Sequence, residues 1–181
     1  MNCIGHVYIA SSLDGYIARL DGDLDWLLKQ SVKNEDHGYD AFMESVDGLV
    51  LGRKSYEKVL SFGAWPYNKP VVVLSRVLSQ DDVPEHLAEK VRITHQTPHD
   101  IMEELYAEGW RNAQVDGGKL IQSFLRSGLI DSLNLTQIPV LLGGGIPLFG
   151  ALDRDINLEH TQTSSFPSGF VHSKYKIKKT I

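Results

Sequence analysis

The sequence is poor in the features that would place the protein at a membrane, on a nucleic acid or around a cysteine-bound metal. Its single cysteine, Cys3, excludes an internal disulfide and a zinc site built from thiolates. No apolar run approaches the roughly 18 residues of a membrane-spanning helix, and the first residues lack the basic and apolar stretches of a signal peptide. With 18 basic and 23 acidic residues, the chain also lacks the positive charge that nucleic-acid binding favours. We therefore expect a cytoplasmic protein without a membrane or nucleic-acid partner.

Two phosphate-binding fingerprints and a metal motif are also missing. No G-x-G-x-x-G follows a predicted strand, and no G-x-x-x-x-G-K-[ST] occurs, so neither an ordinary Rossmann fingerprint nor a P-loop is present. His95 and His99 are four residues apart, but Pro98 between them prevents a shared helical face. We therefore expect no metal site.

The composition is that of a folded globular protein. The chain has 181 residues, of which 42% are hydrophobic and 23% charged. This length predicts a single domain, residues 1–181.

The hydrophobic pattern predicts an α/β fold. Residues 4–10 form a candidate first strand, and the short continuous apolar runs at 49–51 and 71–74 are typical of strands buried on both faces of a parallel sheet. Apolar residues recur at helical spacing over 101–106 and 120–125. Strands that alternate with helices indicate a parallel sheet flanked by helices.

The end of the chain follows a different pattern. Polar and apolar residues alternate over 133–138 and again over 171–178, and the turn residues Pro167, Ser168 and Gly169 precede the second run. We take these two runs as an antiparallel hairpin. The predicted sheet is therefore mixed, mostly parallel, with an antiparallel hairpin at the C-terminal end.

Three junctions in the sequence share one layout. Each has an apolar strand, then small or basic residues, and then a predicted helix. They are LVLGRKSYEKV (49–59), VVVLSR (71–76) and QVDGGKLIQSFL (114–125). A helix N-terminus carries a partial positive charge and free N–H donors, and arginine adds a planar fork that suits phosphate oxygens. In an α/β sheet such junctions meet at the carboxyl ends of the strands. The functional interpretation is that the three junctions bind one phosphate group together. The alternative is that their glycines only allow the chain to turn between strand and helix.

These motifs resemble the dihydrofolate reductase-like family. LVLGRKSYEKV, VVVLSR and VDGGKLI are similar to its three strand ends, while SSLDGYIA (11–18) and PVLLGGG (139–145) resemble the reductase domain of riboflavin biosynthesis more closely. The resemblance covers most of the chain, from residue 4 to about residue 150.

The resemblance implies an NADPH-dependent reductase. In this family the first and third junctions hold the cofactor phosphates and the second holds the 2′-phosphate of the adenosine ribose. An arginine beside that ribose independently favours NADP over NAD. The expected cofactor-binding residues are Gly52, Arg53, Lys54, Ser55, Ser75, Arg76, Gly117, Gly118, Lys119, Leu120 and Ile121.

Three carboxylates are candidate catalytic residues, because reduction of a C=N bond needs a proton as well as a hydride. Asp14 follows the first strand and could equally be a turn residue before Gly15. Asp23 could equally cap a helix that carries the following leucines. Asp116 precedes the Gly-Gly turn and could equally bind the amides of the next helix.

The expected substrate is a small planar heterocycle, either pterin-like or the pyrimidine intermediate of riboflavin biosynthesis. The sequence departs from the riboflavin reductase pattern at Tyr16, where that domain has a lysine, and at Ser75, where it has an acid. Two other functions remain open: a dinucleotide-binding module without catalysis, and an α/β protein that binds flavin or another phosphate ligand. By similarity to the riboflavin-pathway domain, a homodimer is also expected.

Overall fold

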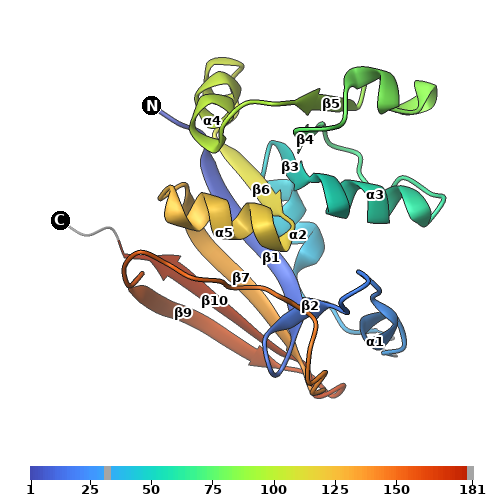
Figure 1. The fold of residues 1–181 in the computed structure, drawn as a ribbon. Helices are drawn as coiled ribbons and strands as arrows, with labels where there is room; N and C mark the ends of the chain where they lie inside the picture. The colour runs from blue at the N-terminus through green and yellow to red at the C-terminus, as the bar shows by residue number, and fades with distance from the viewer. Residues whose placement is uncertain (31–33, 179–181) are drawn as a thin grey trace.

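The computed structural model describes residues 1–30 and 34–178, and they form a twisted mixed sheet with helices on both faces (Figure 1). The larger sheet has the strand order β5-β4-β3-β6-β1-β7-β10-β9, and a second sheet pairs β2 with β8. The strands are β1 Ile4–Ser12, β2 Tyr16–Ala18, β3 Gly48–Gly52, β4 Val71–Leu74, β5 Val91–Thr94, β6 Asn112–Asp116, β7 Ile130–Ile138, β8 Ile146–Pro147, β9 Leu158–Ser165 and β10 Val171–Ile177.

Five helices and two 3₁₀ turns connect the described strands. The helix α4 begins as the sequence predicts, with Pro98 in its first turn and the Thr97 side chain accepting a hydrogen bond from the Asp100 amide. The helices are α1 Asp25–Leu28, α2 Tyr39–Ser45, α3 Arg53–Ser61, α4 Pro98–Ala107 and α5 Gly118–Arg126, with 3₁₀ turns η1 Gln80–Asp82 and η2 Glu85–Leu87.

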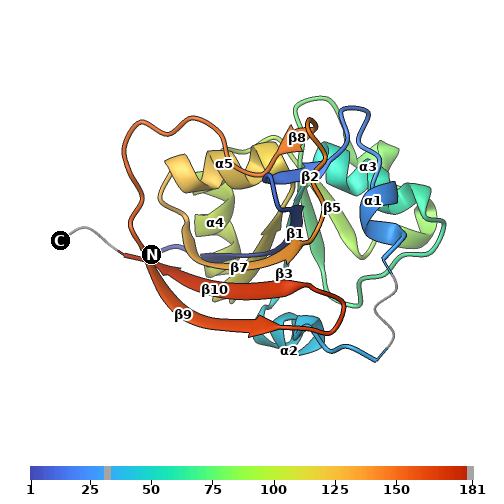
Figure 2. The same cartoon turned by 90° about the horizontal axis from the view of Figure 1, so that it is seen from below.

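The parallel part of the sheet is covered on both faces, which explains why β3 and β4 are continuously apolar. Val50 and Val72 pack into a core with α4 and α5, whereas Leu49, Leu51 and Val73 pack into a second core with α2 and α3. Figure 2 shows α4 and α5 on one side of the sheet and α2 on the other. Each strand therefore buries alternate side chains in two different cores.

The C-terminal hairpin is present, but its first strand differs from the expected one. The turn at 166–170 joins β9 to β10, and β7, which contains 133–138, pairs antiparallel with the other side of β10. The sequence 158–165 has few apolar residues, because β9 lies at the sheet edge and is mostly exposed. A strand without a buried face leaves little hydrophobic pattern to detect.

The expected helix after Asp23 is shorter than predicted and uses another residue as its apolar anchor. The helix α1 starts at Asp25 with Leu24 as its N-cap, and Asp23 accepts a hydrogen bond from the Leu24 amide instead of capping the helix. Trp26 is buried, whereas Leu28 is 64% exposed.

Candidate functional site

The three junctions predicted to form a phosphate site meet at one edge of the sheet. The strand β3 pairs in parallel with β4 on one side and with β6 on the other, with Gly52 opposite Leu74 and Leu51 opposite Asp116. The ends of the three strands are therefore neighbours, which confirms their predicted convergence. The ligand roles of the individual residues stay predictions.

Two helices, α3 and α5, begin at this edge with their N-termini uncapped. The prediction of a helix after the second junction is wrong, because β4 is followed by a loop and the 3₁₀ turn η1, and the Ser75 hydroxyl accepts hydrogen bonds from loop amides there. Neither α3 nor α5 has a side-chain cap or an acidic residue in its first turn, whereas α1, α2 and α4 each have an aspartate there. Instead, Arg53 and Lys54 begin α3, and Lys119 lies in the first turn of α5. Basic side chains are unfavourable beside the positive end of a helix dipole, so this arrangement favours a bound anion between the two helices.

Gly117 lets the first and third junctions approach each other. Its φ of 110° lies in the left-handed range, and a Cβ at this position would lie 2.8 Å from the Ser55 hydroxyl oxygen and 3.5 Å from the Gly52 nitrogen. Leu120 lies beside Gly52 from the other direction. The missing side chain therefore allows close contact between the β3–α3 and β6–α5 junctions.

The basic residues of the junctions are on the surface. Arg53 forms an ion pair with Glu57 one turn later, with 3.1 Å between Nη1 and Oε1, and both side chains are more than 40% exposed. Lys54, Arg76 and Lys119 are exposed. Within residues 1–30 and 34–178, no side-chain hydrogen bond or ion pair engages the Arg76 guanidinium. Arg76 is therefore available to bind a phosphate directly. Arg53 can bind one by leaving Glu57, because an exposed ion pair of this kind is weak.

Two predicted cofactor residues lie mainly inside the fold. The buried Ser75 hydroxyl oxygen accepts hydrogen bonds from the amides of Val77 (3.2 Å) and Leu78 (2.9 Å). Ile121 is fully buried, and its amide donates to the Gly117 carbonyl. Ser75 shapes the loop that carries Arg76, and Ile121 anchors α5 in the core. Their cofactor contacts stay predictions, and the burial of Ile121 does not favour one.

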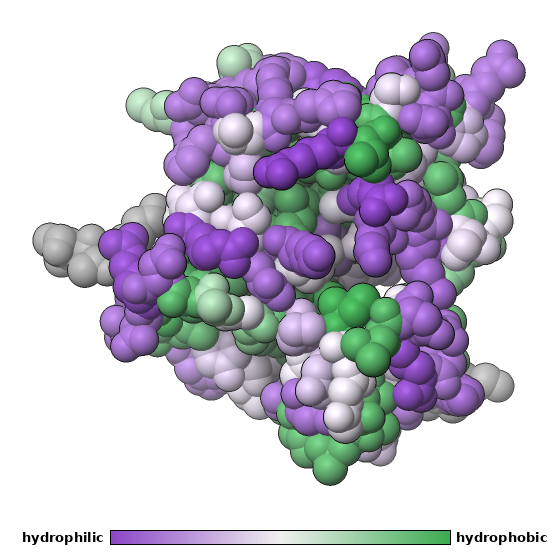
Figure 3. All heavy atoms as spheres, viewed as in Figure 1, coloured by the Kyte–Doolittle hydropathy of each residue, from purple (hydrophilic) through white to green (hydrophobic). Residues whose placement is uncertain are grey.

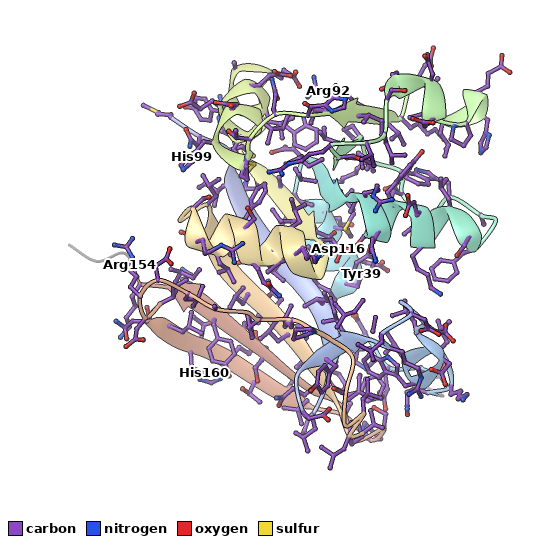
Figure 4. All side chains as sticks on the ribbon, viewed as in Figure 1. Tyr39, Arg92, His99, Asp116, Arg154 and His160 are labelled. Carbon is purple, nitrogen blue, oxygen red and sulfur yellow. The ribbon has the colours of Figure 1, made fainter. Side chains whose placement is uncertain are left out.

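Asp116 is the candidate acid that lies at this edge. Its carboxylate is partly buried and accepts a hydrogen bond from the Gly117 amide at 2.8 Å. Burial raises the pKa of Asp116 to about 6, because the charged form loses solvation. Its charge in turn contributes to the raised pKa values of Tyr39 and Tyr67, after burial as the main cause. Figure 4 shows Asp116 and Tyr39 close together.

The other two candidate acids make local contacts. Asp14 accepts hydrogen bonds from the Ser12 hydroxyl (2.6 Å) and from the amides of Leu142 and Gly143, so it joins the β1–β2 turn to the glycine-rich connection. These bonds lower the pKa of Asp14 and favour its ionised form. Asp23 lies 3.4 Å from the Lys58 nitrogen. The contacts of Asp14 favour its interpretation as a turn residue, whereas Asp23 does not cap α1 as its structural alternative predicted. The catalytic roles of both stay predictions.

A cavity of about 510 Å³ opens on the face of the sheet that α2 covers. Its floor contains Tyr8 and Ala10 of β1 and Thr136 and Ile138 of β7, and Tyr39 lies on its wall. Leu27, Leu28 and Phe170 add apolar surface. Besides burial, the charge of Asp116 contributes to the raised pKa of Tyr39, so this wall of the cavity lies near the edge with the three junctions.

Polar and aromatic side chains lie beside the cavity floor, on the same face of the sheet. His172 is buried, and its Nδ1 lies 2.8 Å from the Thr136 hydroxyl, while its Nε2 has no hydrogen-bond partner among the described residues. The Tyr8 hydroxyl donates to the His37 carbonyl at 2.8 Å, and the Tyr8 and His172 rings are 5.3 Å apart. Burial raises the pKa of Tyr8 to about 12, so Tyr8 remains a hydrogen-bond donor at neutral pH.

The residues that line the cavity were not among the predicted site residues. The alternation of β1 and β7 could have placed Tyr8, Ala10, Thr136 and Ile138 on one face. Tyr39 gives no such signal, because its position depends on how α2 docks against the sheet. In the part of the chain that the structure describes, no group of three or more His, Cys, Asp or Glu side chains could hold a metal, and no helix is both long and apolar enough to cross a membrane.

The surface around the site is mainly hydrophilic. Figure 3 shows mostly polar side chains over α3, α4 and α5, with hydrophobic ones toward the lower end of the same view. Exposed apolar residues in the chain include Leu13 at 58% and Leu141 at 70%, which flank the contacts of Asp14.

The strand order, the parallel core and the C-terminal hairpin define a dihydrofolate reductase-like α/β fold. A dihydrofolate reductase from Enterococcus faecalis, solved with NADP(H) and RAB-propyl, superposes with a TM-score of 0.62 at 18% identity over 99% of this chain and 100% of that one. At this identity the similarity concerns the fold alone.

The RibD C-terminal domain family matches residues 6–172, and the chain belongs to this family. It is 35% identical to the uncharacterised protein YwjB of Bacillus subtilis over 163 residues, 88% of this chain and 90% of that protein. A candidate riboflavin biosynthesis protein from Shewanella sp. PV-4 shares 41% identity with a TM-score of 0.91, covering 99% of this chain and 100% of that one.

A more distant structure carries a named activity. The diaminohydroxyphosphoribosylaminopyrimidine deaminase/5-amino-6-(5-phosphoribosylamino)uracil reductase of Thermotoga maritima has a TM-score of 0.70 at 18% identity, over 98% of this chain and 57% of that one.

Proposed function

We propose that the protein is an NADPH-dependent oxidoreductase that reduces a small planar heterocycle, pterin-like or pyrimidine-like. The observation that carries the proposal is the pair of uncapped, basic helix N-termini at neighbouring strand ends, next to a cavity of about 510 Å³. Family membership and the NADP(H) bound by the E. faecalis dihydrofolate reductase support it. The pyrimidine reductase activity named for the T. maritima protein supports a ring substrate of this kind.

The residues at the strand ends fit a dinucleotide phosphate group. The first-turn amides of α3 and α5 would bind the pyrophosphate, with Arg53, Lys54 and Lys119 balancing its charge. Gly117 lets the starts of α3 and α5 lie close enough together for both to contact it. Arg76 would bind the 2′-phosphate, which distinguishes NADPH from NADH. When bound, the nicotinamide supplies the hydride.

The chain itself supplies positioning and a proton-holding group. The apolar floor and the Tyr39 wall would hold a ring flat and limit its contact with water. Asp116 lies at the edge with the three junctions, close enough to Tyr39 of the cavity wall that its charge contributes, after burial, to the raised pKa of that tyrosine. With a pKa of about 6, Asp116 keeps a protonated fraction near neutral pH. We therefore propose Asp116 as the acid that helps to protonate the substrate. A single-domain, cytoplasmic homodimer stays a prediction.

The test measures binding and turnover separately. NADPH should quench or shift the protein fluorescence on titration and bind more tightly than NADH. Reduction of a panel of pterins and aminopyrimidines should then be followed as NADPH absorbance. Binding without turnover of any compound would select the dinucleotide-binding module, and copurification of a yellow chromophore would select the flavin-binding alternative.

A further inference from the structure

The rim of the cavity carries negative charge. Glu35, Asp36 and Asp40 all line it. Among the described lining residues there is no lysine or arginine, and His37 is the one basic side chain. Its Nε2 lies 3.0 Å from a Glu35 oxygen and so already has a partner.

These carboxylates are not neutralised by cations elsewhere in the described residues. Glu35 accepts hydrogen bonds from the Ser168 amide (2.8 Å) and hydroxyl (2.6 Å), and these bonds, the hydroxyl's first, lower the pKa of Glu35. Asp36 accepts from the Gly38 amide at 2.7 Å, and Asp40 is exposed in the first turn of α2. No lysine or arginine within residues 1–30 and 34–178 forms an ion pair with any of the three. Their negative potential therefore extends into the cavity mouth.

The rest of the lining suits an uncharged ring. Ala10, Leu27, Ile138 and Phe170 provide apolar contact, and the Thr136 hydroxyl is a polar group on the floor. Lys174 lies on the same face but lines an adjoining groove of about 350 Å³, which shares Tyr8 with the cavity. A phosphate held in the cavity itself would face carboxylates rather than this lysine, and such like-charge contacts oppose binding.

We infer that the cavity selects a planar heterocycle that bears amino groups and no phosphate, and that Asp36 and Asp40 enforce this selection. Amino groups donate hydrogen bonds, which carboxylates accept, whereas a phosphate is repelled by them. The inference rests on the proposed function and narrows its substrate class. It separates this chain from a reductase whose substrate carries a ribose phosphate.

The experiment compares 5-amino-6-(ribosylamino)uracil with its 5′-phosphate by calorimetric titration into the full chain with NADP⁺ present. The unphosphorylated compound should bind at least about tenfold more tightly at low salt, and the ratio should narrow at high salt because exposed charges are screened. Asp36→Asn combined with Asp40→Asn should narrow the ratio about three- to tenfold, mainly by tightening binding of the phosphate. Asparagine keeps an acceptor oxygen for the Gly38 amide, so the loop should retain its fold.

Glu103→Gln is the matched control, because Glu103 is an exposed carboxylate on α4, across the sheet from the cavity. It should leave the ratio unchanged. Equal or tighter binding of the phosphate by the unmodified chain, binding of neither compound, or an unchanged ratio in the double variant would overturn the inference. Failure of the proposed function gives a different result: NADPH does not bind or is not oxidised, while the ratio of the affinities for the two compounds persists.

Discussion

Arg76 and Arg53 lie at neighbouring strand ends, yet their expected effects on the cofactor differ. Arg76→Ala should weaken NADPH binding about 10- to 100-fold and NADH binding by less than about threefold, because a charge-assisted bond to the 2′-phosphate is lost. Arg53→Ala should weaken both about three- to tenfold, since the pyrophosphate is common to both cofactors. Fluorescence titration with each cofactor measures the two ratios.

Arg126→Ala is the control for these variants, because Arg126 is exposed in the last turn of α5, at the opposite end from the strand ends. Both affinities should be unchanged in it. Equal losses of NADPH and NADH in Arg76→Ala would remove Arg76 from a 2′-phosphate site.

The pKa of Asp116 predicts a pH dependence of turnover. Since the acid must be protonated to donate, kcat/KM should fall as the pH rises through about 6, and this inflection should be absent in Asp116→Asn. The Asn variant should lose turnover more than NADPH affinity. The opposite pattern, lost affinity with unchanged turnover, would make Asp116 a structural residue.

The same pKa shift predicts a stability effect with a defined sign. Burial raises the pKa of Asp116 from 3.8 to about 6, so the folded state holds the proton more tightly than the unfolded state. The resulting stabilisation is complete below about pH 4 and is lost as the pH rises through 6. Asp116→Asn should therefore gain up to about 3 kcal/mol of unfolding free energy relative to the unmodified protein between pH 4 and pH 7. Urea unfolding at both pH values measures this gain, and a constant difference would contradict the shift.

At this scale the sequence could identify the charged residues of the strand ends but not the cavity wall. Arg53 directly follows β3, Arg76 lies two residues after β4, and Asp116 is the last residue of β6, so their convergence at the strand ends could be predicted. Tyr39 begins a seven-residue helix with one buried residue, Met43. Nothing local in such a helix indicates which part of the sheet it will contact.

Among the secondary-structure elements, the β6–α5 junction depends most on one residue. Gly117→Ala should lower the unfolding free energy by about 1–3 kcal/mol and weaken NADPH binding, because the new methyl group would strain the backbone and press on Ser55. The change should separate α3 from α5 at their N-termini. Denaturant unfolding and cofactor titration report the two effects independently.

Gly109→Ala separates strain from contact. Gly109 has a similar φ of 105°, but a Cβ there would meet nothing within 4 Å. It should lose stability through backbone strain alone and keep full NADPH affinity. If the two variants bind NADPH equally well, Gly117 does not serve to bring the two junctions together.

The elements that the sequence predicted well are those with two buried faces or one strong apolar stripe. The strands β3 and β4 and the helices α4 and α5 meet this description, and their cores confirm the assignment. The exposed edge strand β9 and the four-residue helix α1 do not, since tertiary contacts rather than local pattern define them. For this reason the alternating pattern assigns residues 133–138, rather than 158–165, to the first strand of the hairpin.

For the molecule as a whole, NADPH binding should raise the unfolding free energy and should protect some segments from hydrogen exchange more than others. NADPH at about 100 times its Kd should add about 2.7 kcal/mol to the unfolding free energy, because it binds the folded state alone. Amide hydrogen exchange should slow most at the starts of α3 and α5 and least in the β9–β10 hairpin. Protection confined to the hairpin would place the cofactor on another part of the surface.

The position of β1 between β6 and β7 has a consequence for biosynthesis. Ile4 pairs with Asn112, and Tyr8 pairs with Asn134, so β1 has partners that are synthesised more than a hundred residues later. Such non-local pairing forms slowly, because a long loop must close, at a cost in entropy, before the strands make stabilising contacts. The apolar residues of β1 therefore stay exposed in the growing chain until β6 and β7 have been synthesised.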